Sequence, residues 1–306
     1  MRKLIVGSVF SAALAAAQWG GEVHKVELAR APTFTEGVVV DHDGAVYISH
    51  ASRITKVSPA GEASLWAESP SPNGHKILGD GTHLICDRTG FVFHFSADGK
   101  RLRTAAEAPN AANDLTLDLA NGGFYFTSPY GSEEEPIGKV YYVDRTGRAA
   151  VVADGLQFPN GIVLRPDGRT LLVGESSQNR ILEFPVEGPG RLGERRVFAL
   201  MPYRERYDPK KHLEGPLPDG MALDTAGNLY VAHYGAGEVQ VFDPDGKLLR
   251  SLPGSGKFTS NVAFGGDQMR QLYISGSVGP TQQTTGLLVR LDLPWVEGLG
   301  ILPPRP

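Results

Sequence analysis

A side chain with an oxygen donor recurs six times along the chain, each time just before a short apolar segment. The recurrences are spaced roughly 40–60 residues apart, which is the range of structural repeats with several strands each. Carboxylate and amide oxygens are the donors that hard divalent cations prefer, and Ca²⁺ takes roughly six to eight of them. The pattern predicts a ring around one metal ion, Ca²⁺ first, with Mg²⁺, Mn²⁺ or Zn²⁺ as substitutes. The six residues are Glu36, Asn73, Asn113, Asn160, Asp219 and Asn261.

The segments that follow these residues must bring them together. Each one reads as an apolar strand, a glycine-containing turn and two further strands; VVVDHDGAVYIS follows Glu36-Gly37 and MALDTAGNLYVAH follows Asp219-Gly220. Alternation, β-branched content and D-G pairs predict strands and tight turns. Six such repeats predict an all-β fold, a six-bladed β-propeller with a central metal-binding channel, which His24–Ala29 closes as a last strand. A two-sheet sandwich is the alternative, and isolated Asx turns are the alternative reading of any single Asn or Asp.

The N-terminus has the pattern of a targeting segment. Arg2 and Lys3 precede an apolar run over Leu4–Leu14, and an A-x-A arrangement follows. This is typical of a cleavable secretory signal peptide, and the run is short for a membrane span. We therefore expect residues 1–17 to be removed and residues 18–306 to form a single domain that is periplasmic or secreted, with no membrane insertion after cleavage. An uncleaved anchor is the alternative.

Composition excludes several classes of function. The formal net charge is −4 and no basic run occurs, so no nucleic-acid partner is expected. The single cysteine, Cys86, excludes an intramolecular disulfide and a cysteine-rich metal site. The stretch Gly188–Gly193 matches G-x-G-x-x-G but contains a proline and precedes no helical pattern, so no dinucleotide site is expected. A monomer or dimer is expected.

Longer motifs identify a resemblance that covers essentially the whole chain after the N-terminal segment. They read EGVVVD, NDLTLD, FPNGIVLRPDGRTLLVGES, PDGMALDTAGNLYVAH and NVAFGGDQMRQLYIS. Together they resemble the family of senescence marker protein (regucalcin), gluconolactonase and luciferin-regenerating enzyme, and the motifs are most similar to those of the gluconolactonase-like branch. The resemblance implies a six-bladed propeller with one divalent ion in its channel. In the regucalcin branch a sugar-binding arginine lies two residues before the asparagine that corresponds to Asn113, and in this chain that position is Ala111.

The resemblance also implies which ring residues bind the ion and which one reacts. The implied ligands are Glu36, Asn113, Asn160 and Asp219, and Asp219 is the implied general base. A bound ion would polarise a lactone carbonyl or a water molecule, while the carboxylate moves the proton. The expected activity is a metal-dependent opening of a lactone ring, with a sugar lactone such as gluconolactone as the small-molecule substrate. A phosphotriesterase-like hydrolase and a non-catalytic ligand- or protein-binding propeller are the alternatives.

Further residues are candidates for substrate contacts. Asn73 and Asn261 belong to the ring without being implied ligands, His75 follows Asn73 by two positions on the same predicted strand, and Tyr130 follows the third repeat's FTSP. The longest interval between ring residues contains a charged insertion, Pro202–Leu217, directly before the fifth ring residue. We expect this insertion on the same face as the ring, either as a lid over the substrate or as an ordinary surface loop.

Overall fold

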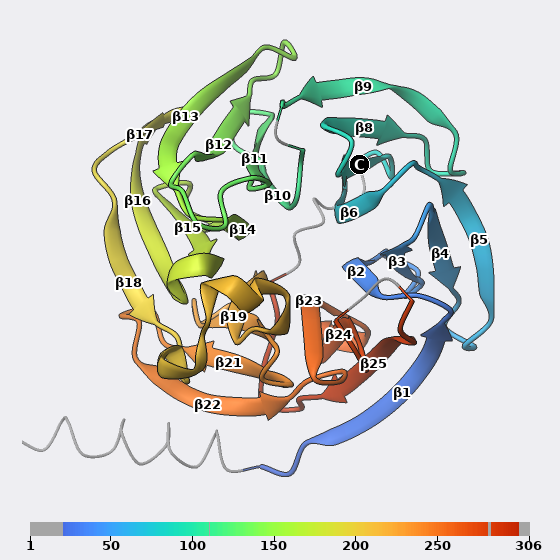
Figure 1. The fold of residues 1–306 in the computed structure, drawn as a ribbon. Helices are drawn as coiled ribbons and strands as arrows, with labels where there is room; N and C mark the ends of the chain where they lie inside the picture. Colours follow the sequence, from blue (N-terminus) through green and yellow to red (C-terminus); the bar gives the residue numbers. More distant parts are fainter. Residues whose placement is uncertain (1–20, 110, 281–282, 300–306) are drawn as a thin grey trace, which may run out of the picture.

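A computed structural model describes residues 21–109, 111–280 and 283–299 of the chain. Figure 1 shows these residues as separate sheets arranged around one axis, each sheet running from an innermost strand near the axis to an outermost strand at the rim. The described residues form six such blades, so the predicted all-β class and the six-bladed propeller are confirmed. The predicted signal peptide lies outside the described residues.

The first three blades each contain four antiparallel strands in chain order, from the axis outward. Their strands are β2 (Thr35–Val40), β3 (Val46–His50), β4 (Arg53–Val57) and β5 (Ala63–Glu68) in blade 1; β6 (Pro72–Ile77), β7 (His83–Asp87), β8 (Phe91–Phe95) and β9 (Arg101–Glu107) in blade 2; and β10 (Leu115–Asp118), β11 (Gly123–Ser128), β12 (Gly138–Val143) and β13 (Ala149–Leu156) in blade 3.

Blades 4 and 5 follow the same plan, with one extra short strand in blade 4, and blade 6 takes its outer strand from the start of the chain. Their strands are β14 (Pro159–Leu164), β15 (Thr170–Glu175), β16 (Arg180–Gly188), β17 (Arg191–Leu192) and β18 (Arg196–Leu200); β19 (Leu217–Leu223), β20 (Leu229–Tyr234), β21 (Glu238–Phe242) and β22 (Leu248–Pro253); and β23 (Phe258–Gly265), β24 (Gln271–Ser277), β25 (Gly286–Asp292) and β1 (His24–Ala31). Within the described part of the chain, four short 3₁₀ helices lie between strands, namely η1 (Ser176–Gln178), η2 (Arg204–Arg206), η3 (Pro209–Glu214) and η4 (Asp267–Met269).

The ring closes by pairing the beginning of the chain with its end. Strand β1 lies antiparallel to β25, from the pair His24↔Asp292 to the pair Ala31↔Gly286. The blue and red strands at the lower right of Figure 1 are this pair. The predicted closing strand is confirmed and extends two residues beyond Ala29. Closure covers the outer edge of β25 with a strand from the other end of the chain, so that the first and last parts of the ring are joined in one sheet.

The innermost strands share an irregularity at the predicted ring positions. In blade 1 the register skips from Thr35 to Val38, and in blade 5 it skips from Pro218 to Met221. The same shift occurs in the innermost strands of blades 2, 4 and 6. A bulge of this kind interrupts the alternation of side chains between the two faces of the strand and changes the direction of the side chain at the bulge. The repeated motif is therefore a repeated bulge that turns one polar side chain toward the axis.

The glycines that follow the ring residues allow neighbouring innermost strands to approach each other. A Cβ at Gly37 would overlap the backbone oxygen of Asn73, and a Cβ at Gly161 would overlap the backbone oxygen of Asp219. Backbone atoms cannot move aside as a flexible side chain can. The glycine in E-G and N-G is therefore required by packing between blades, because a side chain there would push apart the strands that carry the ring.

We predict that Gly161→Ala destabilises the fold, because the new methyl group displaces the backbone at Asp219. Overpacking of a tight interior costs about 1–3 kcal/mol, so the melting temperature should fall by several degrees. Gly188→Ala is the matched control, because a Cβ there meets only the end of the Arg191 side chain at 3.4 Å or more. Equal melting temperatures for both variants, measured by circular dichroism, would contradict the packing role.

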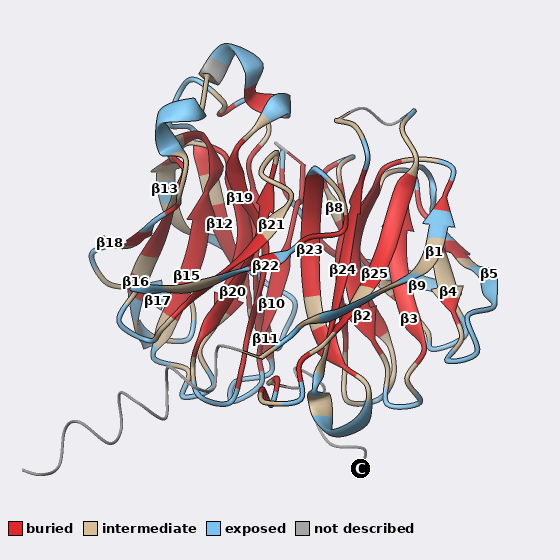
Figure 2. Cartoon of the chain, turned by 90° about the horizontal axis from the view of Figure 1, so that it is seen from below, coloured by how far each residue is buried: buried red, intermediate tan, exposed pale blue. Residues whose placement is uncertain are grey.

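Apolar side chains fill the space between blades, and Figure 2 shows the inner strands buried while exposed residues gather on the turns and outermost strands. Between blades 1 and 2 the core also contains two histidines. His75 Nε2 lies 2.7 Å from His83 Nδ1, and Trp66 packs against both rings, with centroid distances of 6.0 and 4.4 Å. Burial lowers the pKa of His83 to about 3, and burial together with His83 lowers the pKa of His75 well below its usual value.

These two histidines predict a loss of stability in acid. Above about pH 6.5 they are neutral in both the folded and the unfolded chain, and they add no pH dependence. As the pH falls from about 6.5 toward 4, the unfolded chain gains protons that the folded chain does not bind, so the free energy of unfolding decreases. The slope is about 1.4 kcal/mol per pH unit for each histidine. The free energy of unfolding, measured by urea unfolding at several pH values in this range, should depend less on pH in the double variant His75→Leu/His83→Leu than in the exposed control His42→Gln. The same pH dependence in both variants would contradict this account.

Candidate active site at the channel mouth

A cavity of about 80 Å³ lies on the axis, at the end where the innermost strands begin. Four blades each contribute one predicted ring residue to it, and each of these residues is between 5 and 8% exposed. The structure thus brings the four implied ligands together in one cavity. The lining residues are Phe34, Glu36, Arg88, Asn113, Phe158, Asn160, His212, Leu217, Asp219, Tyr234 and Pro280.

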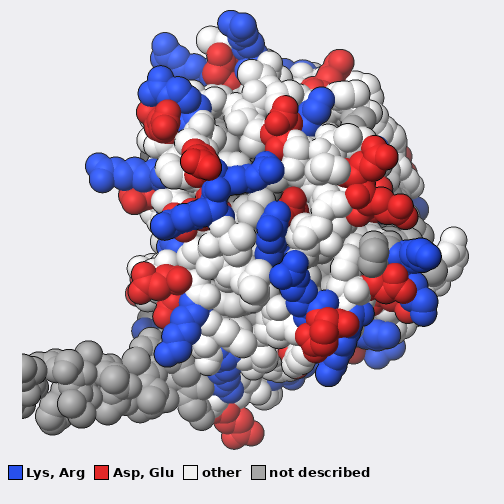
Figure 3. Space-filling model, turned by 60° about the vertical axis from the view of Figure 1, so that its left-hand side comes forward, with Lys and Arg blue, Asp and Glu red and all other residues white. Residues whose placement is uncertain are grey.

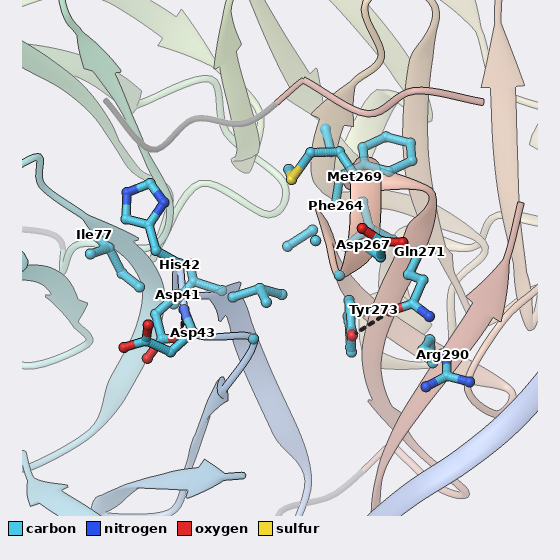
Figure 4. A pocket seen from close by; sticks show the side chains of 18 of the residues that line it. Asp41, His42, Asp43, Ile77, Phe264, Asp267, Met269, Gln271, Tyr273 and Arg290 are labelled. Atoms are coloured by element: carbon cyan, nitrogen blue, oxygen red, sulfur yellow. Dashed lines mark hydrogen bonds between the residues drawn. The ribbon is translucent and has the colours of Figure 1, made fainter. Parts of the chain in front are cut away.

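A larger cavity of about 580 Å³ opens between blades 1 and 6 and is lined at the other ends of their innermost strands. Figure 4 shows Asp41 and His42 on one wall and Tyr273 and Arg290 on the other. Asp41 accepts a hydrogen bond from the backbone N–H of Asp43 at 2.9 Å, so it serves the turn between β2 and β3. None of the six ring residues, all of which are described, lines this cavity. The candidate site is therefore the smaller cavity at the first mouth.

Two carboxylates share the channel-mouth cavity with one arginine. Arg88 Nη2 donates to Glu36 Oε1 at 2.9 Å, and both side chains are largely buried. Burial raises the pKa of Glu36 to about 7, against the opposing effect of Arg88. Burial also raises the pKa of Asp219 well above its usual value, and the charge of Glu36 raises it further. Two carboxylates and one guanidinium leave the cavity with an excess of negative charge when both acids are ionised.

The asparagines leave acceptor oxygens for a cation. Asn160 donates a side-chain hydrogen bond to Asp219, and its own Oδ1 is buried without a hydrogen-bond partner among the described residues. Asn113 donates to the phenol of Tyr130. An orphaned carbonyl oxygen is costly in a dry site unless a donor or a cation meets it. Two carboxylates and two amide groups form an oxygen-only donor set, so the residues fit a hard divalent cation.

Arg88 is the charged residue of the pocket that sequence analysis missed. It lies in the turn between β7 and β8, which Asp87 holds by accepting from the backbone N–H of Thr89 at 3.0 Å. The guanidinium carbon of Arg88 lies 5.9 Å from the centre of the Tyr130 ring. The tetrapeptide DRTG that contains it occurs again at residues 144–147, in the turn between β12 and β13. The motif alone therefore carries no signal for a pocket position.

The remaining predicted residues have three different outcomes. Tyr130 does not line the cavity but lies directly behind it, in contact with Arg88 and with Asn113. Asn73 occupies the ring position of blade 2 and is buried, with its Nδ2 unpartnered among the described residues, yet it does not line the cavity. The structure does not bring His75 to the pocket, because the bulge between Pro72 and His75 breaks the alternation on which that prediction depended.

The position predicted in blade 6 is displaced by one residue. The bulge there lies between Thr259 and Asn261, so Ser260 occupies the ring position. Ser260 Oγ donates to the backbone oxygen of Thr35 at 2.7 Å and does not line the cavity. Asn261 instead donates to Asp114, whose Oδ2 is otherwise buried without a partner. The prediction that Asn261 belongs to the same ring as Glu36 is therefore corrected.

The charged insertion forms part of the pocket wall. Helices η2 and η3 stand above the ends of the blades on the mouth side, as Figures 1 and 2 show. His212 and Leu217 from this segment line the cavity. Its cations Arg206 and Lys211 point to solvent and lie 4.0 and 3.9 Å from acidic neighbours. The predicted position on the ring face is confirmed, while Arg206 and Lys211 have acidic neighbours and no described cation of the insertion lines the cavity.

Charge over the rest of the surface is mixed. Figure 3 shows basic and acidic side chains interspersed over the face seen in that view. On blade 4, Arg196 Nη2 lies 2.8 Å from Glu183 Oε1. Among the described residues no helix is both long enough and apolar enough to cross a bilayer.

Known proteins resemble this chain in sequence and in fold. The family model for the SMP-30/Gluconolactonase/LRE-like region matches residues 34–277. Lactonase drp35 of Staphylococcus aureus (strain USA300) is 30% identical over 247 residues, which cover 75% of this chain and 73% of that protein. A gluconolactonase from Xanthomonas campestris is 26% identical, with a TM-score of 0.73 and 92% of each chain covered. A calcium-binding protein, regucalcin, from Agrobacterium tumefaciens is 22% identical, with a TM-score of 0.73 over 91% of this chain and 96% of that one, and shares the fold.

Proposed function

Because the chain belongs to the SMP-30/gluconolactonase/LRE-like family, we propose that it is a lactone hydrolase and that the channel-mouth cavity is its active site. The observation that carries the proposal is the convergence of two buried carboxylates, two asparagines and one arginine from five segments in one cavity. A structural role does not require two carboxylates to be buried beside each other. Hydrolysis requires both a proton acceptor and a group that stabilises negative charge, and this cavity contains both.

We propose that Glu36, Asn113, Asn160 and Asp219 hold one divalent cation, with Ca²⁺ as the first choice. The excess negative charge and the unpartnered Oδ1 of Asn160 support this assignment. When bound, the ion would supply Lewis-acid polarisation of the lactone carbonyl. Arg88 limits how much negative charge the cation must balance, because it already pairs with Glu36.

In the proposed reaction Asp219 is the general base. As the oxygen of a water molecule bonds to the carbonyl carbon, one proton of that water passes to the Asp219 carboxylate. The guanidinium of Arg88 stabilises the negative charge that develops on the carbonyl oxygen. When the ring C–O bond breaks, the same proton passes from Asp219 to the leaving alkoxide, which leaves a hydroxy acid.

We propose a sugar lactone such as gluconolactone as substrate. The cavity has a polar floor at the ring and apolar walls from Phe34, Phe158 and Tyr234. Such walls exclude water from the reacting carbonyl and strengthen the charge interactions on the floor. The gluconolactonase from Xanthomonas campestris supports this choice of substrate class.

A substrate panel tests the proposal. Purified protein should hydrolyse one or more of δ-gluconolactone, γ-butyrolactone and δ-valerolactone faster than paraoxon, with release of one proton per ring opened. Faster hydrolysis of paraoxon would instead support a phosphotriesterase. No turnover of any compound in the presence of Ca²⁺ would contradict an enzymatic role and favour a binding propeller.

We also propose that the protein is periplasmic or secreted, on the N-terminal pattern alone. The test is the N-terminal sequence of the protein recovered from the host's envelope or medium fractions. A mature start at or near residue 18 would support cleavage, and an intact N-terminus on a cytoplasmic protein would contradict it.

A further inference from the structure

The insertion between β18 and β19 is docked onto the propeller at two places. Its Tyr203 ring stacks on His233 of β20, with centroids 5.9 Å apart and planes 8° from parallel. Tyr207 packs against the buried cluster that contains Phe34 and Tyr234, two residues of the pocket wall. A segment fixed at both points holds its side chains in defined positions over the cavity.

One polar side chain of this segment enters the cavity. His212 on η3 is 8% exposed and lines the cavity together with Asp219. Its ring packs on Phe158, with centroids 4.3 Å apart and planes at 56°. Burial lowers the pKa of His212 to about 4, so the imidazole is neutral near pH 7.

Hydrogen-bond partners behind His212 hold the orientation of its ring. Tyr207 Oη lies 2.8 Å from His212 Nδ1. Ser177 of η1 hydrogen-bonds the phenol oxygen of Tyr207 and holds the pKa of that phenol down against the larger effect of burial. Ser177 Oγ also lies 3.4 Å from His212 Nδ1, so two hydroxyl groups that can donate face this nitrogen. A neutral imidazole whose Nδ1 accepts from a hydroxyl carries its proton on Nε2, and no described residue hydrogen-bonds Nε2.

We propose that His212 is a specificity-determining residue whose Nε2–H donates a hydrogen bond to a hydroxyl oxygen of the lactone. The inference rests on the proposed lactone hydrolase and adds a reason for selecting hydroxylated lactones over alkyl lactones. A buried donor loses its partner when the substrate lacks the oxygen, so the site discriminates against that substrate. The residue comes from the insertion and not from a blade, so the insertion sets substrate preference as part of a fixed wall.

The test compares two lactones with the same ring size, δ-gluconolactone and δ-valerolactone. His212→Phe should lower kcat/KM for δ-gluconolactone about tenfold, as expected for one neutral hydrogen bond, and change δ-valerolactone by less than about twofold. His212→Gln, which keeps an N–H donor at a similar reach, should restore most of the preference. Tyr207→Phe should lose part of it, because the orienting hydrogen bond is gone.

Matched controls separate this role from a purely structural one. Tyr203 belongs to the same insertion, and its hydroxyl lies 3.3 Å from Glu238 of β21. Tyr203 does not line the cavity, so Tyr203→Phe should leave the ratio of the two kcat/KM values unchanged. Melting curves establish that each variant is folded. If His212→Phe lowers both lactones equally, or neither, the assignment is overturned while the lactone hydrolase stands. If wild-type protein hydrolyses neither lactone, the proposed function itself fails.

Discussion

The Asp219→Asn variant is expected to lose lactone hydrolysis by about 10²–10⁴-fold in kcat while still binding a divalent cation. The amide keeps an oxygen that can face the ion, but it cannot accept a proton from water. The neighbouring Asn160 side chain can still reach the substituted residue. Measurement of kcat with δ-gluconolactone and of Ca²⁺ binding by titration calorimetry gives both halves of the expectation.

Asp224→Asn is the matched control for this variant. Asp224 follows the same strand, β19, and is also buried, but it accepts from Asn228 and Tyr230 and does not line the mouth cavity. Its substitution should lower stability and leave kcat near the wild-type value. Full activity of Asp219→Asn, or equal loss of activity in both variants, would contradict the role of Asp219 as base.

The Arg88→Met variant is expected to have the second largest effect. Loss of a preorganised cationic donor at a developing oxyanion costs about 10²–10³-fold in kcat. Glu36 loses its ion-pair partner at the same time, so the cavity gains net negative charge. The variant should therefore bind Ca²⁺ more tightly than the wild type while it turns over more slowly, which is the opposite combination to that expected from loss of a ligand.

The second copy of the same tetrapeptide provides the control for Arg88. Arg145 lies in the DRTG turn between β12 and β13, is exposed, and does not line the mouth cavity. Arg145→Met should leave both kcat and the dissociation constant for Ca²⁺ unchanged. Weaker Ca²⁺ binding by Arg88→Met, or unchanged turnover, would contradict the proposed role of this arginine.

The sequence predicted much of the ring because the ring is built by repetition. Glu36, Asn113, Asn160 and Asp219 lie at or just before the start of equivalent innermost strands, and equivalent strands of a propeller meet at one axis. Exact register was harder to predict. A bulge breaks alternation at the ring positions of blades 1, 2, 4, 5 and 6, so residues two apart, such as Asn73 and His75, do not share a direction.

The places of several other residues could not be predicted from the sequence. Ser260 and Asn261 differ by one position, and only the strand pairing shows which one occupies the ring. Arg88 and Arg145 have the same neighbours in the sequence, because both belong to a DRTG turn. The two turns lie at opposite ends of their blades, and of the two only the β7–β8 turn is at the channel mouth. His212 belongs to an insertion with no counterpart in the other repeats, so its place over the cavity depends on how that segment packs.

Proton release from δ-gluconolactone by metal-stripped protein, followed as Ca²⁺ is added, tests the central claim most directly. We predict that stripped wild-type protein is inactive, that activity returns with about one ion per chain, and that the melting temperature rises over the same range because the ion binds the folded chain. Full activity of the stripped protein, or a folded and Ca²⁺-saturated protein that opens no lactone ring, would contradict the account.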